Sequence, residues 1–128
     1  MITVKTSYYA KVARRVNPSS KLAVISNTHP SWFNQDYVNA KEVAPRWSDI
    51  ESYTNGDISF DRFKERYYEY LIDKFGTIDE IRSYILDVIK PEDGDEIIFL
   101  CWEKDGKRCH RSAFAEFVFN TEYKGELE

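Results

Sequence analysis

One short segment, between Leu100 and Ser112, concentrates side chains that can react or carry charge. An apolar run precedes the Asp105-Gly106 turn and a helical pattern follows it, so the segment reads as strand, turn and helix. Open α/β sheets bind ligands beyond the carboxyl ends of their strands, and we therefore expect a site here. The candidate side chains are those of Glu103, Lys104, Cys109, His110, Arg111 and Ser112.

Three of these residues have the chemistry of catalytic groups. A thiol at the start of a helix and beside cations favours its thiolate form, which makes Cys109 a candidate nucleophile. His110 can move a proton near neutral pH. Glu103 can act as a general acid or base. We predict these three as the catalytic residues of the site.

The other three residues suit an anionic ligand. Arg111 can hold a phosphate or carboxylate through two parallel N–H bonds, Lys104 adds positive charge, and Ser112 adds a hydroxyl donor. The first turn of the helix also leaves backbone N–H groups unpaired at the positive end of the helix dipole. These features predict a site for a small anion of the phosphate or nucleotide type.

A second polar cluster follows the buried apolar run Leu22–Ser26. Because the carboxyl ends of parallel strands share one edge of a sheet, Ser26 and His29 are predicted to face the same crevice. His29 can serve as an acid or base. The alternative is that Asn27 and Thr28 only make hydrogen bonds within a turn.

Purely structural roles remain open for the same residues. Cys101 lies within an apolar strand, where cysteine is usually a small buried side chain. Cys109 is unreactive if it is shielded from solvent. Arg111 can pair with Glu103 or Glu116. The segment has no glycine-rich phosphate loop, and Cys109 and Arg111 stand too close together for a phosphatase-type cradle.

The sequence predicts no metal site and no cofactor. Cys101, Cys109, His110 and His29 supply thiols and imidazoles, but the Cys-x7-Cys spacing matches none of the usual zinc patterns. Redox sensing through the two cysteines is not favoured, because a thiol in a central strand is poorly accessible.

Hydrophobic periodicity predicts the elements that position these residues. Alternation or apolar runs predict strands at 2–6, 22–26 and 96–102, and helical spacing predicts helices at 58–75, 78–89 and about 109–119. Gly76 ends the first of these helices, and Thr77 and Glu80 form a capping-box pair at the start of the next. Residues 31–56 are predicted to be a long loop with short helical turns, and thus a candidate lid or binding loop. Strands separated by helices predict an α/β fold with a mainly parallel sheet and flanking helices.

Composition sets the class of protein. The chain has 128 residues, 42% hydrophobic and 31% charged, which fits one α/β domain at 1–120 followed by a polar, frayed tail at 121–128. A net charge of −4 argues against a protein that coats nucleic acid. The first residues lack the layout of a signal peptide, and no apolar run is long enough to cross a bilayer. We therefore expect a cytoplasmic protein with two reduced cysteines.

The chain also resembles a known family. Leu100-Cys101-Trp102-Glu103-Lys104 followed by Cys109-His110-Arg111 resembles the closing signature of the family known as domain of unknown function 488. Ser7 to Lys11, Pro30 to Phe33, Lys41 to Pro45 and Phe63 to Tyr70 resemble other parts of it, so that the resemblance spans about Thr6 to Val118. It implies a compact α/β domain of bacteria, archaea and their phages, with no established activity. The basic stretch between the two cysteine motifs departs from the proline- or glycine-rich spacer of that family.

Two classes of function follow from these patterns. The first is a small-anion or nucleotide site, with or without catalysis, at the strand ends. The second is a non-enzymatic accessory module that binds a protein or nucleic acid through exposed aromatic residues of the long loop. The residues that would carry this second function are Trp32, Phe33, Tyr37 and Trp47.

Overall fold

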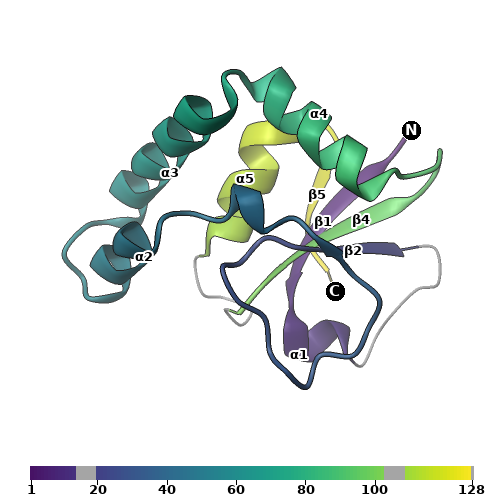
Figure 1. The fold of residues 1–128 in the computed structure, drawn as a ribbon, viewed down its shortest axis with the longest axis horizontal. Coiled ribbons are helices and arrows are strands. Elements are labelled where there is room, and N and C mark those ends of the chain that lie inside the picture. The colour runs from purple at the N-terminus through teal and green to yellow at the C-terminus, as the bar shows by residue number, and fades with distance from the viewer. Residues whose placement is uncertain (14–19, 103–108, 128) are drawn as a thin grey trace.

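The computed structural model describes residues 1–13, 20–102 and 109–127. These residues form a five-stranded sheet with the strand order β3-β2-β4-β1-β5, and all of its neighbouring strands are parallel. Helices cover the sheet on both sides (Figure 1). The predicted α/β class with a parallel sheet is thus confirmed. The strands are β1 (Thr3–Tyr8), β2 (Ser20–Val24), β3 (Val38–Asn39), β4 (Glu96–Cys101) and β5 (Tyr123–Glu126).

The two long helices follow the apolar pattern of the sequence and begin at side-chain caps. The hydroxyl of Ser59 accepts a hydrogen bond from the backbone of Arg62, and that of Thr77 accepts one from the backbone of Glu80. Gly76 separates the two helices with a φ of 107°, which glycine adopts without the penalty of a Cβ. The helices are α1 (Tyr9–Val12), the 3-10 turn η1 (Lys41–Val43), α2 (Trp47–Thr54), α3 (Phe60–Phe75), α4 (Ile78–Ile89) and α5 (His110–Val118).

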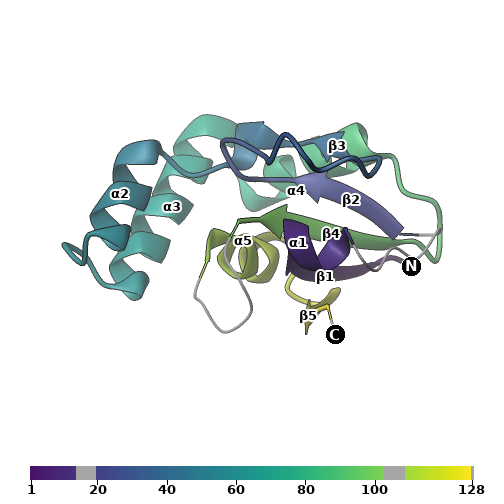
Figure 2. The ribbon, with the colours of Figure 1, turned by 90° about the horizontal axis from the view of Figure 1, so that it is seen from below.

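Strand β4 is the centre of the core, because its side chains are buried on both faces. Ile97 and Phe99 belong to an apolar cluster with residues of α3, α4 and α5. Ile98 and Leu100 point the other way, into a smaller cluster with Tyr9 of α1. Figure 2 shows α1 and α4 on opposite sides of the sheet. Burial on both faces is what the continuous apolar run predicted.

Two segments differ from the predictions. The stretch 31–56 is not only a loop, since it contains the short strand β3 and the eight-residue helix α2. Residues 123–126 of the polar tail are not frayed, since they form β5, which pairs in parallel with β1. Both elements are held by tertiary contacts, which local periodicity does not report. None of the described helices combines the length and apolar character needed to span a bilayer.

Candidate functional site

A pocket of about 380 Å³ opens where β2 and β4 end and α5 begins. Strands β2 and β4 are parallel neighbours, with Val24 opposite Leu100, so that the residues following each strand emerge side by side. Helix α5 starts next to them because Cys109, its N-terminal flanking residue, lies beside Cys101 at the end of β4. The pocket is lined by Ser26, Asn27, Thr28, Trp47, Ile50, Thr54, Cys101, Trp102, Cys109 and His110. The structure therefore brings Cys109 and His110 of the first predicted cluster together with Ser26 of the second.

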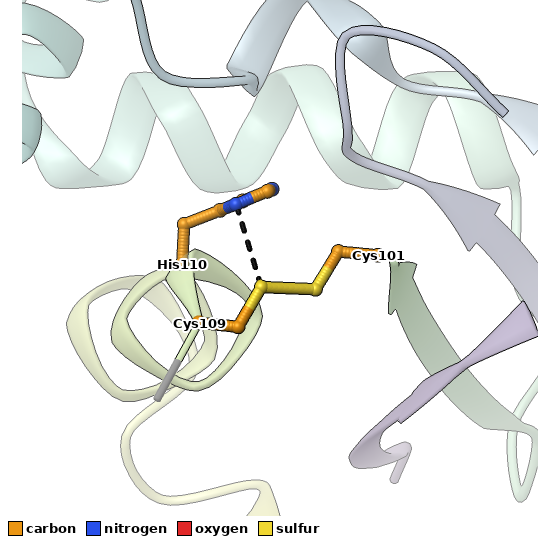
Figure 3. A group of neighbouring side chains, drawn as sticks. All are labelled: Cys101, Cys109 and His110. Carbon is orange, nitrogen blue, oxygen red and sulfur yellow. Dashed lines mark hydrogen bonds between the residues drawn. A yellow bond between two sulfur atoms is a disulfide. The ribbon is translucent and has the colours of Figure 1, made fainter. Parts of the chain in front are cut away.

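A disulfide joins Cys101 to Cys109 in the structure (Figure 3). The prediction of two reduced thiols is thus wrong for this state, and Cys109 is not a free nucleophile in it. The spacing in sequence could not reveal the pairing, because the fold places the last residue of β4 against the first turn of α5. Both cysteines are nearly buried, at 1% and 7% exposure for Cys101 and Cys109 respectively, and both face the pocket.

His110 is a buried residue beside the sulfur of Cys109, and its hydrogen bonds define its tautomer. Its Nε2 lies 2.8 Å from the carbonyl oxygen of Ile25, which can only accept, so Nε2 carries the hydrogen. The unprotonated Nδ1 then faces the sulfur of Cys109 at 3.6 Å. Burial is the main cause that lowers the pKa of His110 to about 4; the hydrogen bond to the Ile25 carbonyl opposes this shift, and the charge of Arg111 adds to it. The imidazole is consequently neutral at pH 7 and is a weaker base than the sequence suggested.

A relay of hydroxyl groups shapes the side of the pocket that follows β2. Ser26 donates its hydrogen to the carbonyl of Thr28 at 2.6 Å, so Tyr9 donates to the Ser26 oxygen at 2.5 Å. Burial, the largest effect, raises the pKa of Tyr9 to about 12, which keeps this donor protonated. The indole N–H of Trp102 donates to the same Thr28 carbonyl at 3.0 Å. This network fixes the loop after β2 to the end of β4.

Arg111 lies beneath the site and is only 1% exposed. Its guanidinium donates to the carboxylate of Glu126 at 2.5 and 3.0 Å, and its Nη1 donates to the sulfur of Cys101 at 3.2 Å. Among the described residues, Arg111 pairs with Glu126 of β5 and not with Glu116, while Glu103, the other partner that the sequence suggested, lies outside them. Glu126 was missed because nothing in the polar tail predicted a strand. Arg111 is not among the residues that line the pocket, and its nearest contact with the pocket lining is the sulfur of Cys101.

The remaining predicted residues are spread out. Ser112 donates its hydroxyl to the carbonyl of Cys109 at 3.1 Å, within the first turn of α5. His29 is not among the residues that line the pocket, and its Nε2 lies 2.9 Å from the hydroxyl of Tyr37. Glu103 and Lys104 lie outside the described residues.

Comparison with known proteins gives one match. The model of a family described as domain of unknown function DUF488 matches residues 5–118. The chain belongs to this family. The match covers the pocket and both cysteine motifs of this DUF488 domain, and the resemblance noted in the sequence is confirmed. No curated protein and no solved structure matches the chain.

Helix α2 forms one wall of the pocket of the DUF488 domain, in a segment where the sequence predicted only a long loop with short helical turns. Trp47, Ile50 and Thr54 of α2 line the pocket together with Trp102 and the cysteines. The loop predicted to present four aromatic residues is divided, since Phe33 is buried against Tyr9 while Trp47 belongs to the pocket. Among the described lining residues, all are uncharged at neutral pH. The site therefore offers disulfide, imidazole, hydroxyl, amide and indole groups.

Proposed function

We propose that the protein binds a small anionic ligand of the nucleotide type in this pocket, and that the cysteines and His110 act on it. The proposal rests on one observation: two exposed indoles, of Trp47 and Trp102, line the same pocket as the start of α5. A volume of about 380 Å³ suits a small ligand, because such sites typically measure about 300–1,000 Å³.

The start of α5 supplies the preference for an anion. No side chain of the described residues caps this nine-residue helix, and its first N–H groups lie at the positive end of the helix dipole. A phosphate is the usual partner of such a position. The indoles supply the preference for a planar ring, since nucleic-acid bases stack on aromatic side chains.

The chemistry of the site depends on the oxidation state of the cysteines. In the reduced chain, Cys109 is the nucleophile closest to the helix start, and its thiol would be placed to donate to Nδ1 of His110, which lies 3.6 Å from the sulfur. Because His110 is a weak base, it orients the thiol. When the sulfur attacks a phosphorus atom of the ligand, an S–P bond forms, the P–O bond to the leaving group breaks, and the thiol proton passes through solvent to the departing oxygen. In the oxidised chain the same sulfur is bonded to Cys101, so it is not available as a nucleophile.

Tryptophan fluorescence tests the proposal directly. Reduced protein is titrated with adenosine monophosphate, with inorganic phosphate and with uncharged adenosine. We expect a saturable change with the monophosphate, weaker binding of adenosine, and competition by phosphate. Trp47→Ala removes one stacking surface and should weaken binding about 5- to 150-fold, which corresponds to about 1–3 kcal/mol.

Trp32→Ala is the matched control, because Trp32 is 55% exposed and Trp47 is 59% exposed, but Trp32 does not line the pocket. We expect this variant to bind the monophosphate like the wild type. Equal affinity for the monophosphate and adenosine would contradict the anion site. Equal losses of affinity for the monophosphate in the two tryptophan variants would indicate that the exposed aromatic residues of the long loop bind the ligand instead. This is the result expected of an accessory docking module.

A further inference from the structure

Cys101, Cys109 and His110 form a compact group of soft metal ligands. Their sulfur and nitrogen atoms all lie within 4.8 Å of one another, and all three residues are buried. Zn²⁺ prefers such thiolate and imidazole ligands. Catalytic zinc sites take three protein ligands and leave the fourth position to water or substrate. All three residues line the pocket, so a fourth position between them would open into it.

The tautomer of His110 fits a metal ligand. Its Nε2 donates to the Ile25 carbonyl, which leaves the lone pair of Nδ1 directed toward the sulfur of Cys109 (Figure 3). Histidines that bind metal ions usually donate their other ring N–H to a carbonyl or carboxylate, which fixes the ring. The backbone of the residue after β2 therefore already supplies this outer contact.

The backbones of the two cysteines are far enough apart to hold an ion between the sulfurs once the disulfide is reduced. Their Cα atoms lie 7.5 Å apart, which exceeds the usual range of about 4.4–6.8 Å for disulfides. A tetrahedral ion with Zn–S bonds of about 2.3 Å holds two sulfurs about 3.8 Å apart. Arg111 donates to the sulfur of Cys101 at 3.2 Å, and such a donor stabilises a metal-bound thiolate.

We propose that the reduced chain binds one Zn²⁺ through the sulfurs of Cys101 and Cys109 and Nδ1 of His110, with its fourth position open to the pocket. A dithiol reductant supplies the two electrons and two protons that convert the disulfide to two thiols, and is itself oxidised to a disulfide. Zinc then displaces two thiol protons, and the neutral imidazole contributes its lone pair. Two thiolates balance the charge of the ion, so no net charge is buried.

The proposed zinc site does not match the usual sequence spacings of zinc ligands, because its ligands come from separate secondary-structure elements. Short Cys-x2-Cys patterns describe turns that wrap an ion locally. Here the end of β4 and the start of α5 bring the ligands together, and the carbonyl after β2 orients the histidine. The inference shares its pocket with the proposed function but does not depend on ligand binding. The two would nevertheless interact, because a sulfur bound to zinc is no longer a free nucleophile.

Metal titration of the full chain tests the inference. The protein is reduced, freed of metal by a chelator, and titrated anaerobically with Zn²⁺ and with Co²⁺ as a spectroscopic probe. We expect about one ion per chain, visible bands of tetrahedral Co²⁺ and a thiolate-to-cobalt charge-transfer band. His110→Gln keeps a donor for the Ile25 carbonyl but loses the ligand. It should weaken zinc binding more than about 100-fold, beyond the typical effect of losing an outer contact.

His29→Gln is the matched control and should leave zinc affinity unchanged, because His29 lies outside the pocket. A measurement on the wild type alone avoids any folding defect: stoichiometric zinc should protect both cysteines of the reduced chain from alkylation, and magnesium should not. Octahedral cobalt without a charge-transfer band, or equal zinc affinity in the two histidine variants, would overturn the inference. Zinc binding without any response to adenosine monophosphate would overturn only the proposed function, and the reverse pattern only the metal site.

Discussion

Arg111 and Glu126 form an ion pair that joins the first turn of α5 to β5. The guanidinium side chain is 2% exposed and the carboxylate side chain is 37% exposed. Thr6 of β1 donates its hydroxyl to the same carboxylate, so the pair also connects α5 to the sheet. Since Arg111 contacts the sulfur of Cys101 as well, the C-terminal strand supports the floor of the pocket.

Glu126→Gln tests how much this ion pair contributes to the free energy of unfolding. The substitution removes the charge opposite a buried guanidinium, which cannot recover its full hydration. We expect a loss of about 2 kcal/mol in the free energy of unfolding, measured by urea denaturation. This value lies below the about 3–5 kcal/mol for a fully buried pair, because Glu126 is partly exposed. Glu116→Gln on the exposed face of α5 is the control and should change stability by less than about 0.5 kcal/mol. Equal effects would show that the pair contributes no more than a surface charge.

The hydroxyl relay beside the pocket predicts a non-additive pair of variants. Ser26→Ala leaves the buried hydroxyl of Tyr9 without its acceptor and should cost about 1–3 kcal/mol. Tyr9→Phe in the Ser26→Ala background removes the hydroxyl that has lost its acceptor, so part of the lost stability should be recovered. The Thr28 carbonyl keeps the indole of Trp102 as a donor in both variants. A double-mutant cycle of urea denaturation measures the coupling, and strictly additive losses would contradict the relay.

His110 should make stability depend on pH in mildly acidic solution. The unfolded residue has a pKa of about 6.5, whereas burial lowers the pKa of the folded residue to about 4. As the pH falls from about 6.5 to 4, the unfolded state gains a proton that the folded state excludes, so stability decreases by up to about 3 kcal/mol. The groups that face the ring are Arg111 and Cys109 on its own chain segment and the ring of Tyr67 from α3. Burial raises the pKa of Tyr67 well above its usual value, so this tyrosine stays neutral throughout.

Urea denaturation of the oxidised chain at a series of pH values checks this prediction. His110→Gln should remove the additional slope between pH 6.5 and 4, and His29→Gln should retain it. If the His110 variant keeps the full slope, carboxylates and not the buried imidazole cause the acid sensitivity.

The sequence predicted the fold where burial is periodic or continuous. The apolar run that became β4, and the spacing of Phe63, Tyr67 and Leu71 in α3, are direct signals of buried faces. β5 carries no such signal, because parallel pairing with β1 and the contact of Glu126 with Arg111 stabilise it rather than an apolar face of its own. The same holds for α2, in which the described residues bury only Asp49.

The location of the site was more predictable than the roles of its residues. The carboxyl ends of parallel strands lie at one edge of the sheet, and from this rule we predicted that Ser26 lies near Cys109. The roles of Arg111 and His110 depend on their burial. The buried Arg111 pairs with Glu126, and burial makes His110 a weak base. The pairing of Cys101 with Cys109 depends on how β4 and α5 meet, which a spacing of eight residues does not encode.

Reduction of the disulfide should reveal two thiols of unequal reactivity. Cys109 flanks the N-terminus of α5, where the helix dipole favours a thiolate, and it is the more exposed of the two cysteine residues. Cys101 has the nearby charge of Arg111, but it ends a central strand at 1% exposure, and alkylation requires access as well as charge. We therefore expect iodoacetamide to modify Cys109 first in the reduced, metal-free chain. Peptide mass spectrometry at successive times measures both rates, and the urea-unfolded chain, in which the difference should vanish, is the control. Faster modification of Cys101 would show that the charge of Arg111 outweighs burial, and would make Cys101 the nucleophile of the pocket.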